Sequence, residues 1–241
     1  MANAVVIKKL RKEYGSKTAV NDISLTIEEG KIFSLLGVNG AGKTTTIRML
    51  TGLTRTTAGD AFIFDKSIIN ELNDIKKISN LSPQETAIAP NLTVKENLEF
   101  IAEIYGFDKY RVKEKVNQII EQFSLREVEN SKAKTLSGGW QRRLSIALAL
   151  VSEPKLLFLD EPTLGLDVLA RRELWRIMEK LKGKITIILT THYMEEAESL
   201  SDAIAIMVNG VIKVVGTVDE LKLKTGKNNL EEAFIAIAEE N

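Results

Sequence analysis

Short apolar runs alternate with longer amphipathic segments along most of this 241-residue chain. The segment 24–37, SLTIEEGKIFSLLG, predicts a hairpin that runs into a buried strand ending at Gly37. Further apolar runs predict strands at 61–65, 155–160, 185–191, 203–208 and 211–216. Helical patterns fit between the strands at 155–160, 185–191 and 203–208. Strands that alternate with helices in this way predict a mostly parallel sheet.

The block 86–151 contains helical patterns and no strand signal. Thr93 and Glu96 have the spacing of a capping box, which predicts that a helix begins there. Its apolar face comprises Val94, Leu98, Ile101, Ala102 and Tyr105, and a second helical pattern covers 111–123. We therefore expect a single domain, 1–241, in which an α-helical subdomain (86–151) is inserted into an α/β core made of 1–85 and 152–241.

Composition narrows the class of protein. Lys and Arg together number 33, as do Asp and Glu, so the formal net charge is zero and nothing favours nucleic acid as a partner. The chain has no cysteine, which favours the cytosol. The first ten residues, MANAVVIKKL, lack the apolar core of a signal peptide. The apolar runs are far shorter than the roughly 20 residues that a membrane span needs.

A glycine-rich stretch follows the first buried strand and precedes a helical pattern at 43–53. Gly37, Gly42, Lys43 and Thr44 satisfy the pattern G-x-x-x-x-G-K-[ST] of a phosphate-binding loop, or P-loop. Glycines let backbone amides converge on phosphates, Lys43 supplies a positive charge, and the Thr44 hydroxyl can ligate magnesium. The alternative is a simple glycine-rich turn.

The P-loop completes the expected fold class. We expect an α/β fold: a P-loop NTPase core with a mostly parallel sheet, an antiparallel β-rich N-terminal part and the inserted helical subdomain. The expected nucleotide-binding residues of the loop are Gly37, Val38, Asn39, Gly40, Ala41, Gly42, Lys43, Thr44 and Thr45.

Polar residues stand where two later strands end. Asp160 and Glu161 close the apolar run LLFLDE, and ligands of open α/β sheets bind beyond such strand ends. Asp160 there can reach magnesium, and Glu161 could act as a general base on water. His192, the only histidine, follows the strand at 185–191 and is expected at the same phosphate end. The alternatives are a pair of solvated acids and a packed histidine.

Three further features carry weaker signals. The stretch LSGGW, 136–140, opens a helix with the small residues Ser137, Gly138 and Gly139, and such helix starts bind anions. Gln84 follows a proline and could equally be a turn residue. The ring of Tyr14 could stack on a base or pack in a turn.

With these motifs in this order, the chain resembles the ATP-binding subunit of ABC transporters over its whole length. LSGGW is similar to the signature motif, LLFLDE to the Walker B strand with its glutamate, and LGLD, ending at Asp167, to the D-loop. The resemblance implies ATP and Mg²⁺ as ligands and ATP hydrolysis as the activity. The implied catalytic residues are Lys43, Gln84, Glu161 and His192, the implied magnesium ligands are Thr44, Gln84 and Asp160, and Tyr14 is the implied adenine-stacking residue.

The resemblance also implies a head-to-tail dimer with a second copy or a homologous subunit. ATP would lie between the P-loop of one chain and the signature of the other, so Ser137, Gly138, Gly139 and Asp167 would serve the partner's nucleotide. Hydrolysis would drive transport through separate transmembrane permease subunits, and these subunits would hold the chain at the cytoplasmic face of the membrane. These subunits are expected to dock near 84–98, where Ile88, Pro90 and Leu92 put apolar side chains in a loop.

Two residues depart from the family pattern. Trp140 stands where the signature usually has glutamine, and its ring could pack at the dimer seam or against the helical subdomain. Leu164 stands before GLD, where a small residue is commoner.

Two other classes of function were weighed against transport. ABC ATPases that act on DNA or ribosomes carry long coiled-coil insertions or fused nucleotide domains, and the chain has one copy of each motif and no long heptad run. A small-molecule kinase would leave the signature and Gln84 unexplained.

The terminal LEEAF helix, with no appended β-domain, resembles the branch that exports drugs, lipids or sodium.

Overall fold

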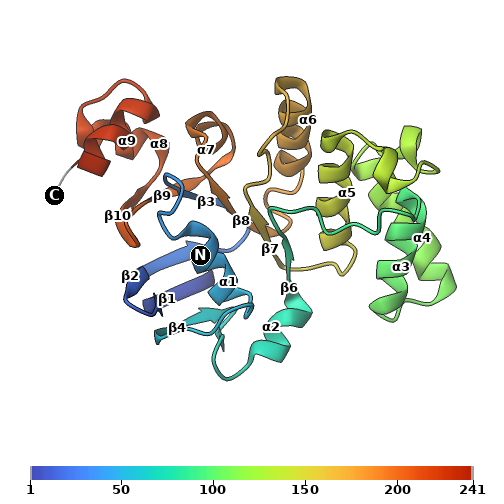
Figure 1. Ribbon diagram of the computed structural model, residues 1–241, viewed down its shortest axis with the longest axis horizontal. Helices are drawn as coiled ribbons and strands as arrows, with labels where there is room; N and C mark the ends of the chain where they lie inside the picture. The colour runs from blue at the N-terminus through green and yellow to red at the C-terminus, as the bar shows by residue number, and fades with distance from the viewer. Residues whose placement is uncertain (1, 240–241) are drawn as a thin grey trace.

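The computed structural model describes residues 2–239, and a six-stranded sheet forms the centre of the molecule (Figure 1). Its strand order is β10-β9-β3-β8-β7-β6. The strands are β3 (Ile32–Leu36), β6 (Ser79–Ser82), β7 (Leu156–Asp160), β8 (Thr186–Thr191), β9 (Ala203–Val208) and β10 (Val211–Gly216). All neighbours pair in parallel except β9 and the edge strand β10. The predicted mostly parallel sheet is confirmed.

A second, antiparallel sheet is built by the N-terminal part of the chain, with the order β2-β1-β4-β5. Its strands are β1 (Asn3–Tyr14), β2 (Lys17–Glu28), β4 (Ala58–Ile63) and β5 (Lys66–Ser67). The antiparallel β-rich N-terminal part is therefore present as predicted. The strand expected at 61–65 ends earlier because Phe64 and Asp65 have φ angles of 46° and 64°, outside the β region.

The hairpin predicted over 24–37 is wrong. β2 pairs with β1, whereas β3 lies between β8 and β9 in the other sheet. The reason is burial: all five residues of β3 are buried, so the strand needs parallel neighbours on both sides. Gly30, at a φ of 74°, lies in the turn where the chain passes from one sheet to the other.

Alternate residues of the central strands enter two different cores. In β7, Leu156 and Phe158 pack with the antiparallel sheet and α1 (Lys43–Leu50), whereas Leu157 and Leu159 pack with the helices on the opposite face. Because successive side chains of a strand point to opposite faces of the sheet, one strand contributes to the cores on both faces. The other helices of the α/β part are α2 (Leu72–Ile78), α6 (Val168–Glu179), α7 (Met194–Leu200), α8 (Val218–Thr225) and α9 (Leu230–Glu239).

Between β6 and β7 the chain forms a group of helices on one side of the molecule (Figure 1). The helices are α3 (Val94–Ile104), α4 (Lys109–Gln122) and α5 (Gly138–Leu150), with short 3-10 turns at Arg126–Val128 and Ala133–Thr135. The capping box of Thr93 and Glu96 is confirmed. The apolar face expected on α3 holds except at Tyr105, which is largely exposed. Within residues 2–239, no helix has the length and apolar character needed to cross a membrane.

Candidate nucleotide-binding site

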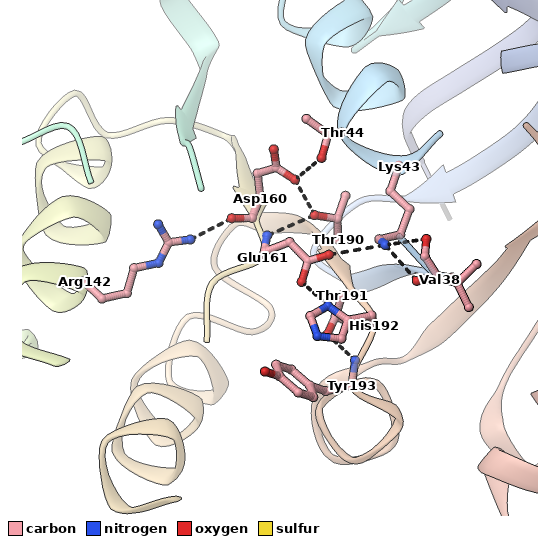
Figure 2. A network of polar contacts seen from close by, with 11 residues as sticks. Val38, Lys43, Thr44, Arg142, Asp160, Glu161, Thr190, Thr191, His192 and Tyr193 are labelled. Carbon is pink, nitrogen blue, oxygen red and sulfur yellow. Dashed lines mark hydrogen bonds and ion pairs between the residues drawn. The ribbon is translucent and has the colours of Figure 1, made fainter. Parts of the chain in front are cut away.

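Three neighbouring parallel strands end at one edge of the sheet and bring the candidate residues together (Figure 2). The P-loop follows β3, Asp160 and Glu161 stand at the end of β7, and His192 follows β8. β8 lies directly between β3 and β7, so residues far apart in the sequence become neighbours. Binding sites of open α/β sheets form at such an edge.

The glycines of the P-loop are required by its close packing. A Cβ atom on Gly37 would collide with the carbonyl oxygen of Met207. Gly42 has a φ of 106°, and a Cβ atom there would lie 2.5 Å from the Ala19 carbonyl oxygen. Gly42 immediately precedes α1, so the backbone amides at the end of the loop and Lys43 lie at the N-terminus of the helix, where its dipole is positive.

Lys43 is buried and its charge is held by oxygen atoms. Its Nζ donates to the carbonyl oxygens of Gly37 (2.7 Å) and Val38 (3.2 Å). The same atom lies 3.3 Å from Glu161 Oε1. The lysine therefore joins the loop after β3 to the carboxylate after β7.

Asp160 lies beside the P-loop helix. The hydroxyls of Thr44 (3.0 Å) and Thr190 (2.6 Å) both donate to its Oδ1. Thr44 and Asp160 are hard oxygen donors, and Mg²⁺ is commonly held by one or two such protein groups together with substrate phosphates. The pair therefore fits a magnesium ion that arrives with a nucleotide.

Glu161 is buried and fully engaged. Its backbone N–H donates to Thr190 Oγ1 (3.0 Å), and its Oε2 lies 2.6 Å from His192 Nδ1. Because Oε1 is paired with Lys43 and a carboxylate only accepts, His192 is the donor from Nδ1. Glu161 also has a φ of 48°, a costly backbone conformation for a residue with a side chain. The polar network fixes both its backbone and its carboxylate.

A cavity of about 440 Å³ opens over these residues. Its lining includes several predicted site residues, namely Tyr14, Asn39, Gly40, Ala41, Gly42, Lys43, Thr44, Thr45, Gln84, Glu161 and His192. Lys17, Ala19 and Leu164 also line it, and the first two carried no signal in the sequence. Gly37, Val38 and Asp160 contact this set through the hydrogen bonds given above. A phosphate loop, two carboxylates and an aromatic ring at the rim suit a nucleotide.

The remaining predicted site residues lie outside this cavity, where α5 and α6 begin. Ser137 directly precedes α5, and Gly138 has open space where a side chain would be. A Cβ atom on Gly139 would lie 3.0 Å from that of Ala170 in α6. Asp167 caps α6 by accepting from the N–H groups of Leu169 and Ala170, both at 2.9 Å. The residues 137–139 and Asp167 therefore lie close together where α5 meets α6, outside the cavity that the P-loop lines.

Trp140 packs within its own chain. Its ring lies against the hydrophobic core of the helical group, and the Arg143 guanidinium lies 4.4 Å from the ring centroid. Arg143 also pairs with Glu173 of α6. Of the two packings considered for Trp140, the structure shows contacts with the helical group.

Two polar residues of the site network were missed by the sequence reasoning. Arg142 of α5 donates to the carbonyl oxygens of Asp160 and Pro162 (both 2.8 Å) and to those of Pro83 and Gln84. Burial lowers the pKa of Arg142 to about 10, so it still carries its charge at neutral pH. Thr190 is the other missed residue. An arginine doublet in a helix and a threonine in a strand give no local signal for contacts so distant in sequence.

The chain matches the model of a known protein family. The family model described as "ABC transporter" matches residues 20–164. The phospholipid-transporting ATPase ABCA3 of Homo sapiens is 43% identical over 226 residues, which cover 92% of this chain and 13% of that protein. ABC transporter A family member 1 of Dictyostelium discoideum is 39% identical over 209 residues, covering 87% of this chain and 24% of that protein. The chain thus spans a minor part of the length of these relatives.

Solved structures share the fold. An ATP-binding subunit of an ABC transporter superposes with a TM-score of 0.86 at 28% identity, covering 97% of this chain and 99% of the other. A dimeric ATP-binding cassette in a post-hydrolysis state, bound to ADP and Pi, has a TM-score of 0.79 at 24% identity, covering 88% and 98%. The α/β fold class predicted from the sequence, a P-loop core with an inserted helical part, is confirmed by these likenesses.

Proposed function

This chain belongs to the ABC transporter family as an ATP-binding ATPase domain, and from that premise we propose that it hydrolyses Mg-ATP to drive export through transmembrane partner subunits. One observation carries the proposal: Lys43, Thr44, Glu161 and His192 meet at a single cavity. The family match supports the predicted transport class over DNA-acting ATPases and kinases. The relatives named as phospholipid-transporting ATPases support transport, and export is proposed from the resemblance of the terminal LEEAF helix.

ATP binding is assigned to the P-loop and to Tyr14. The amides of 39–45 and the start of α1 suit the phosphates, and the half-exposed Tyr14 ring at the rim suits stacking on adenine. Lys43 is held by Glu161 and two carbonyl groups. The β- and γ-phosphates offer Lys43 a stronger anionic partner, so ATP binding releases Glu161 from the ion pair.

Hydrolysis is assigned to Glu161 and His192. Glu161 accepts a proton from the attacking water, and the hydrogen bond from His192 Nδ1 keeps its carboxylate aimed into the cavity. His192 is proposed to contact the γ-phosphate through Nε2, which requires a proton on that nitrogen in addition to the one that Nδ1 donates to Glu161. The exposed Gln84 lies in the lining on the side of the helical group and is proposed to orient the metal and the water.

Thr44, Asp160 and Gln84 would hold magnesium. When bound, the ion neutralises charge that develops on the phosphate oxygens. The two hydroxyl contacts on Asp160 Oδ1 fix the carboxylate at the P-loop helix, and Arg142 holds the backbone of Asp160 from behind.

We propose a head-to-tail dimer in which Ser137, Gly138, Gly139 and Asp167 bind the partner's nucleotide. Their position outside the chain's own cavity supports this arrangement, because these exposed helix starts have no phosphate site of their own chain to serve. The division into a core of 1–85 and 152–241 and a helical subdomain of 86–151 is part of this proposal, because the signature lies on the helical side.

The transmembrane partner is proposed to dock beside Gln84, which would hold the chain at the cytoplasmic face of the membrane. A groove of about 300 Å³ there includes Leu53, whose side chain is 61% exposed. Phe100 and Ile104 on α3 are also largely exposed apolar residues, and Asn80 of β6 donates to Tyr105 at the end of α3. By contrast, Ile88 is half-buried and packs against the core, so it is a weaker docking candidate than its sequence position suggests.

The decisive test is Glu161→Gln. The variant retains the P-loop and loses the base, so it should bind Mg-ATP normally and release phosphate at a rate lower by about a hundredfold or more. With saturating Mg-ATP, light scattering should then show a stable dimer. Exposed Glu198→Gln on α7 is the matched control and should hydrolyse ATP at the native rate. Normal hydrolysis by Glu161→Gln would remove the assigned base, and a monomer under these conditions would contradict the dimer.

A further inference from the structure

A column of stacked side chains lies behind His192. The ring of Tyr193 packs against the imidazole, with centroids 4.1 Å apart and planes at 39° (Figure 2). On the ring of Tyr193, the guanidinium of Arg171 lies 4.7 Å from the centroid. The column therefore runs from Arg171 on α6 through Tyr193 to His192, and from there to Glu161.

The imidazole needs such support because burial alone does not hold it. The His192 side chain is 27% exposed at the rim of the cavity, just beyond the end of β8. One polar contact, from Nδ1 to Glu161, fixes one edge of the ring. A single hydrogen bond leaves the ring free to tilt about it, and the face of Tyr193 restricts that tilt.

Arg171 is itself held mainly by this column. Its Nη1 reaches Glu195 of α7 at 3.5 Å. Its Nε is buried and makes no hydrogen bond within residues 2–239, so the cation–π contact with Tyr193 is a principal contact of the guanidinium. One turn further along α6, Trp175 Nε1 donates to the buried Glu196 and fastens α6 to α7.

We propose that Arg171 and Tyr193 are positioning residues that set the orientation and tautomer of His192; this inference rests on the hydrolysis assigned above. Arg171 stands one turn after Asp167, whose carboxylate caps the same helix. In the head-to-tail dimer, α6 therefore connects the surface that faces the partner's nucleotide to the histidine that faces the chain's own.

The first experiment observes His192 without any hydrolysis. Because the chain has one histidine, the ¹⁵N signals of the imidazole in tag-free protein belong to His192. At a pH where the ring is neutral, the native chain should show mainly the Nδ1–H tautomer. Arg171→Gln and Tyr193→Leu should increase the Nε2–H population severalfold, whereas Tyr193→Phe, which retains the ring, should leave it unchanged. Native signals in both disruptive variants would overturn the proposal.

The second experiment measures ATP hydrolysis. Arg171→Gln should lower kcat about tenfold while KM for ATP stays within about twofold, because Arg171 acts through His192, which orients the proposed base Glu161, and not through the P-loop. Arg171→Lys should restore most of the rate. The matched control is Arg172→Gln, an exposed neighbour on the same turn, which should keep the native kcat. A fall in kcat that the control shares, or a change confined to KM, would contradict a positioning role.

A double-mutant cycle separates positioning from general stability. In the His192→Ala background, single-turnover rates should not change further on adding Arg171→Gln, because the residue through which Arg171 acts is gone. If Arg171→Gln lowered the rate in the His192→Ala background as much as it does in the native chain, the inference would be overturned. If the native chain failed to hydrolyse ATP, the proposed function would fail, and the tautomer measurement would still decide the role of the column.

Discussion

Lys43 shows how a single residue can connect the separate segments of a site. Its buried ammonium group joins two loop carbonyl groups to the carboxylate of Glu161. The sequence identifies this lysine readily, because the P-loop pattern is one short continuous stretch that follows β3. Its ion pair with Glu161 was not predicted, since it joins positions 118 residues apart in the numbering, 161 − 43.

Lys43→Ala should weaken nucleotide binding and hydrolysis together. In the proposed site the lysine holds the phosphates in both the ground and the transition state, so kcat/KM should fall by about a hundredfold or more. Nucleotide titration and phosphate release measure the two effects. Lys76→Ala, an exposed lysine on α2, should change neither. Hydrolysis at the native rate by Lys43→Ala would place the active site elsewhere.

Among the elements, those with strong local patterns were predicted and those defined by tertiary contacts were not. β7 (LLFLD) begins with a continuous apolar run, β8 (TIILTT) combines apolar and β-branched residues, and α3 has a capping box, so each is recognisable in the sequence. β6, with the sequence SNLS, is a strand only because it pairs with β7, and no propensity marks it. β1 contains several register shifts against β2, which disturb the alternation on which a prediction would rest.

The candidate site divides in the same way. Glycine spacing, paired carboxylates and the lone histidine are visible as local motifs, and the structure brings them to one cavity. Arg142 and Thr190 can be recognised as site residues only from the tertiary structure. Arg142 of α5 binds the Asp160 backbone and Thr190 of β8 binds the Asp160 side chain, and both contacts join segments far apart in the sequence.

At the level of elements, Arg142 fastens α5 to the ends of β6 and β7. Arg142→Met retains much of the volume but removes the donor to two buried carbonyl groups, those of Asp160 and Pro162, so the free energy of unfolding should fall by about 2–4 kcal/mol. Chemical denaturation measures this. Arg126→Met, which removes only exposed ion pairs, should have little effect. Equal stability of the two variants would show that the buried fork contributes nothing.

The docking groove is a second prediction at this level. Leu53→Glu should reduce co-purification with the proposed transmembrane partner, because Leu53 is an exposed apolar residue of the groove beside Gln84. Thr44, Gln84 and Asp160 line the same groove, so basal ATPase activity is measured in parallel and must be retained for the loss to be attributed to docking. Leu223→Glu on α8, where the side chain is 85% exposed and outside the groove, is the matched control. Undiminished recovery of the partner with Leu53→Glu would move the docking surface elsewhere.

For the whole molecule, the separation of the signature from the P-loop within one chain is the feature that demands explanation. Two inactive chains can test it. Lys43→Ala removes the phosphate lysine, and Ser137→Arg puts a bulky cation where the partner's γ-phosphate is proposed to sit. Each should be inactive as a homodimer. In a mixture, the Ser137→Arg chain supplies an intact P-loop and the Lys43→Ala chain an intact signature, so one complete site forms at their interface.

We therefore expect ATPase activity in the mixture, below that of the native dimer and above that of either chain alone. If both sites must act together, one complete site hydrolyses too slowly to detect, and pairing becomes the measure. Glu161→Gln is then added to the Ser137→Arg chain, so that the complete site keeps its ATP, and ATP-dependent heterodimers are detected by light scattering. A signature that served the phosphates of its own chain would leave both chains defective whatever their partner, because no combination would restore a chain's own site. If the mixture showed no activity and no ATP-dependent pairing, the result would contradict the shared site. Ser137–Gly139, which lie outside the chain's own cavity, would then not be binding a partner's nucleotide either.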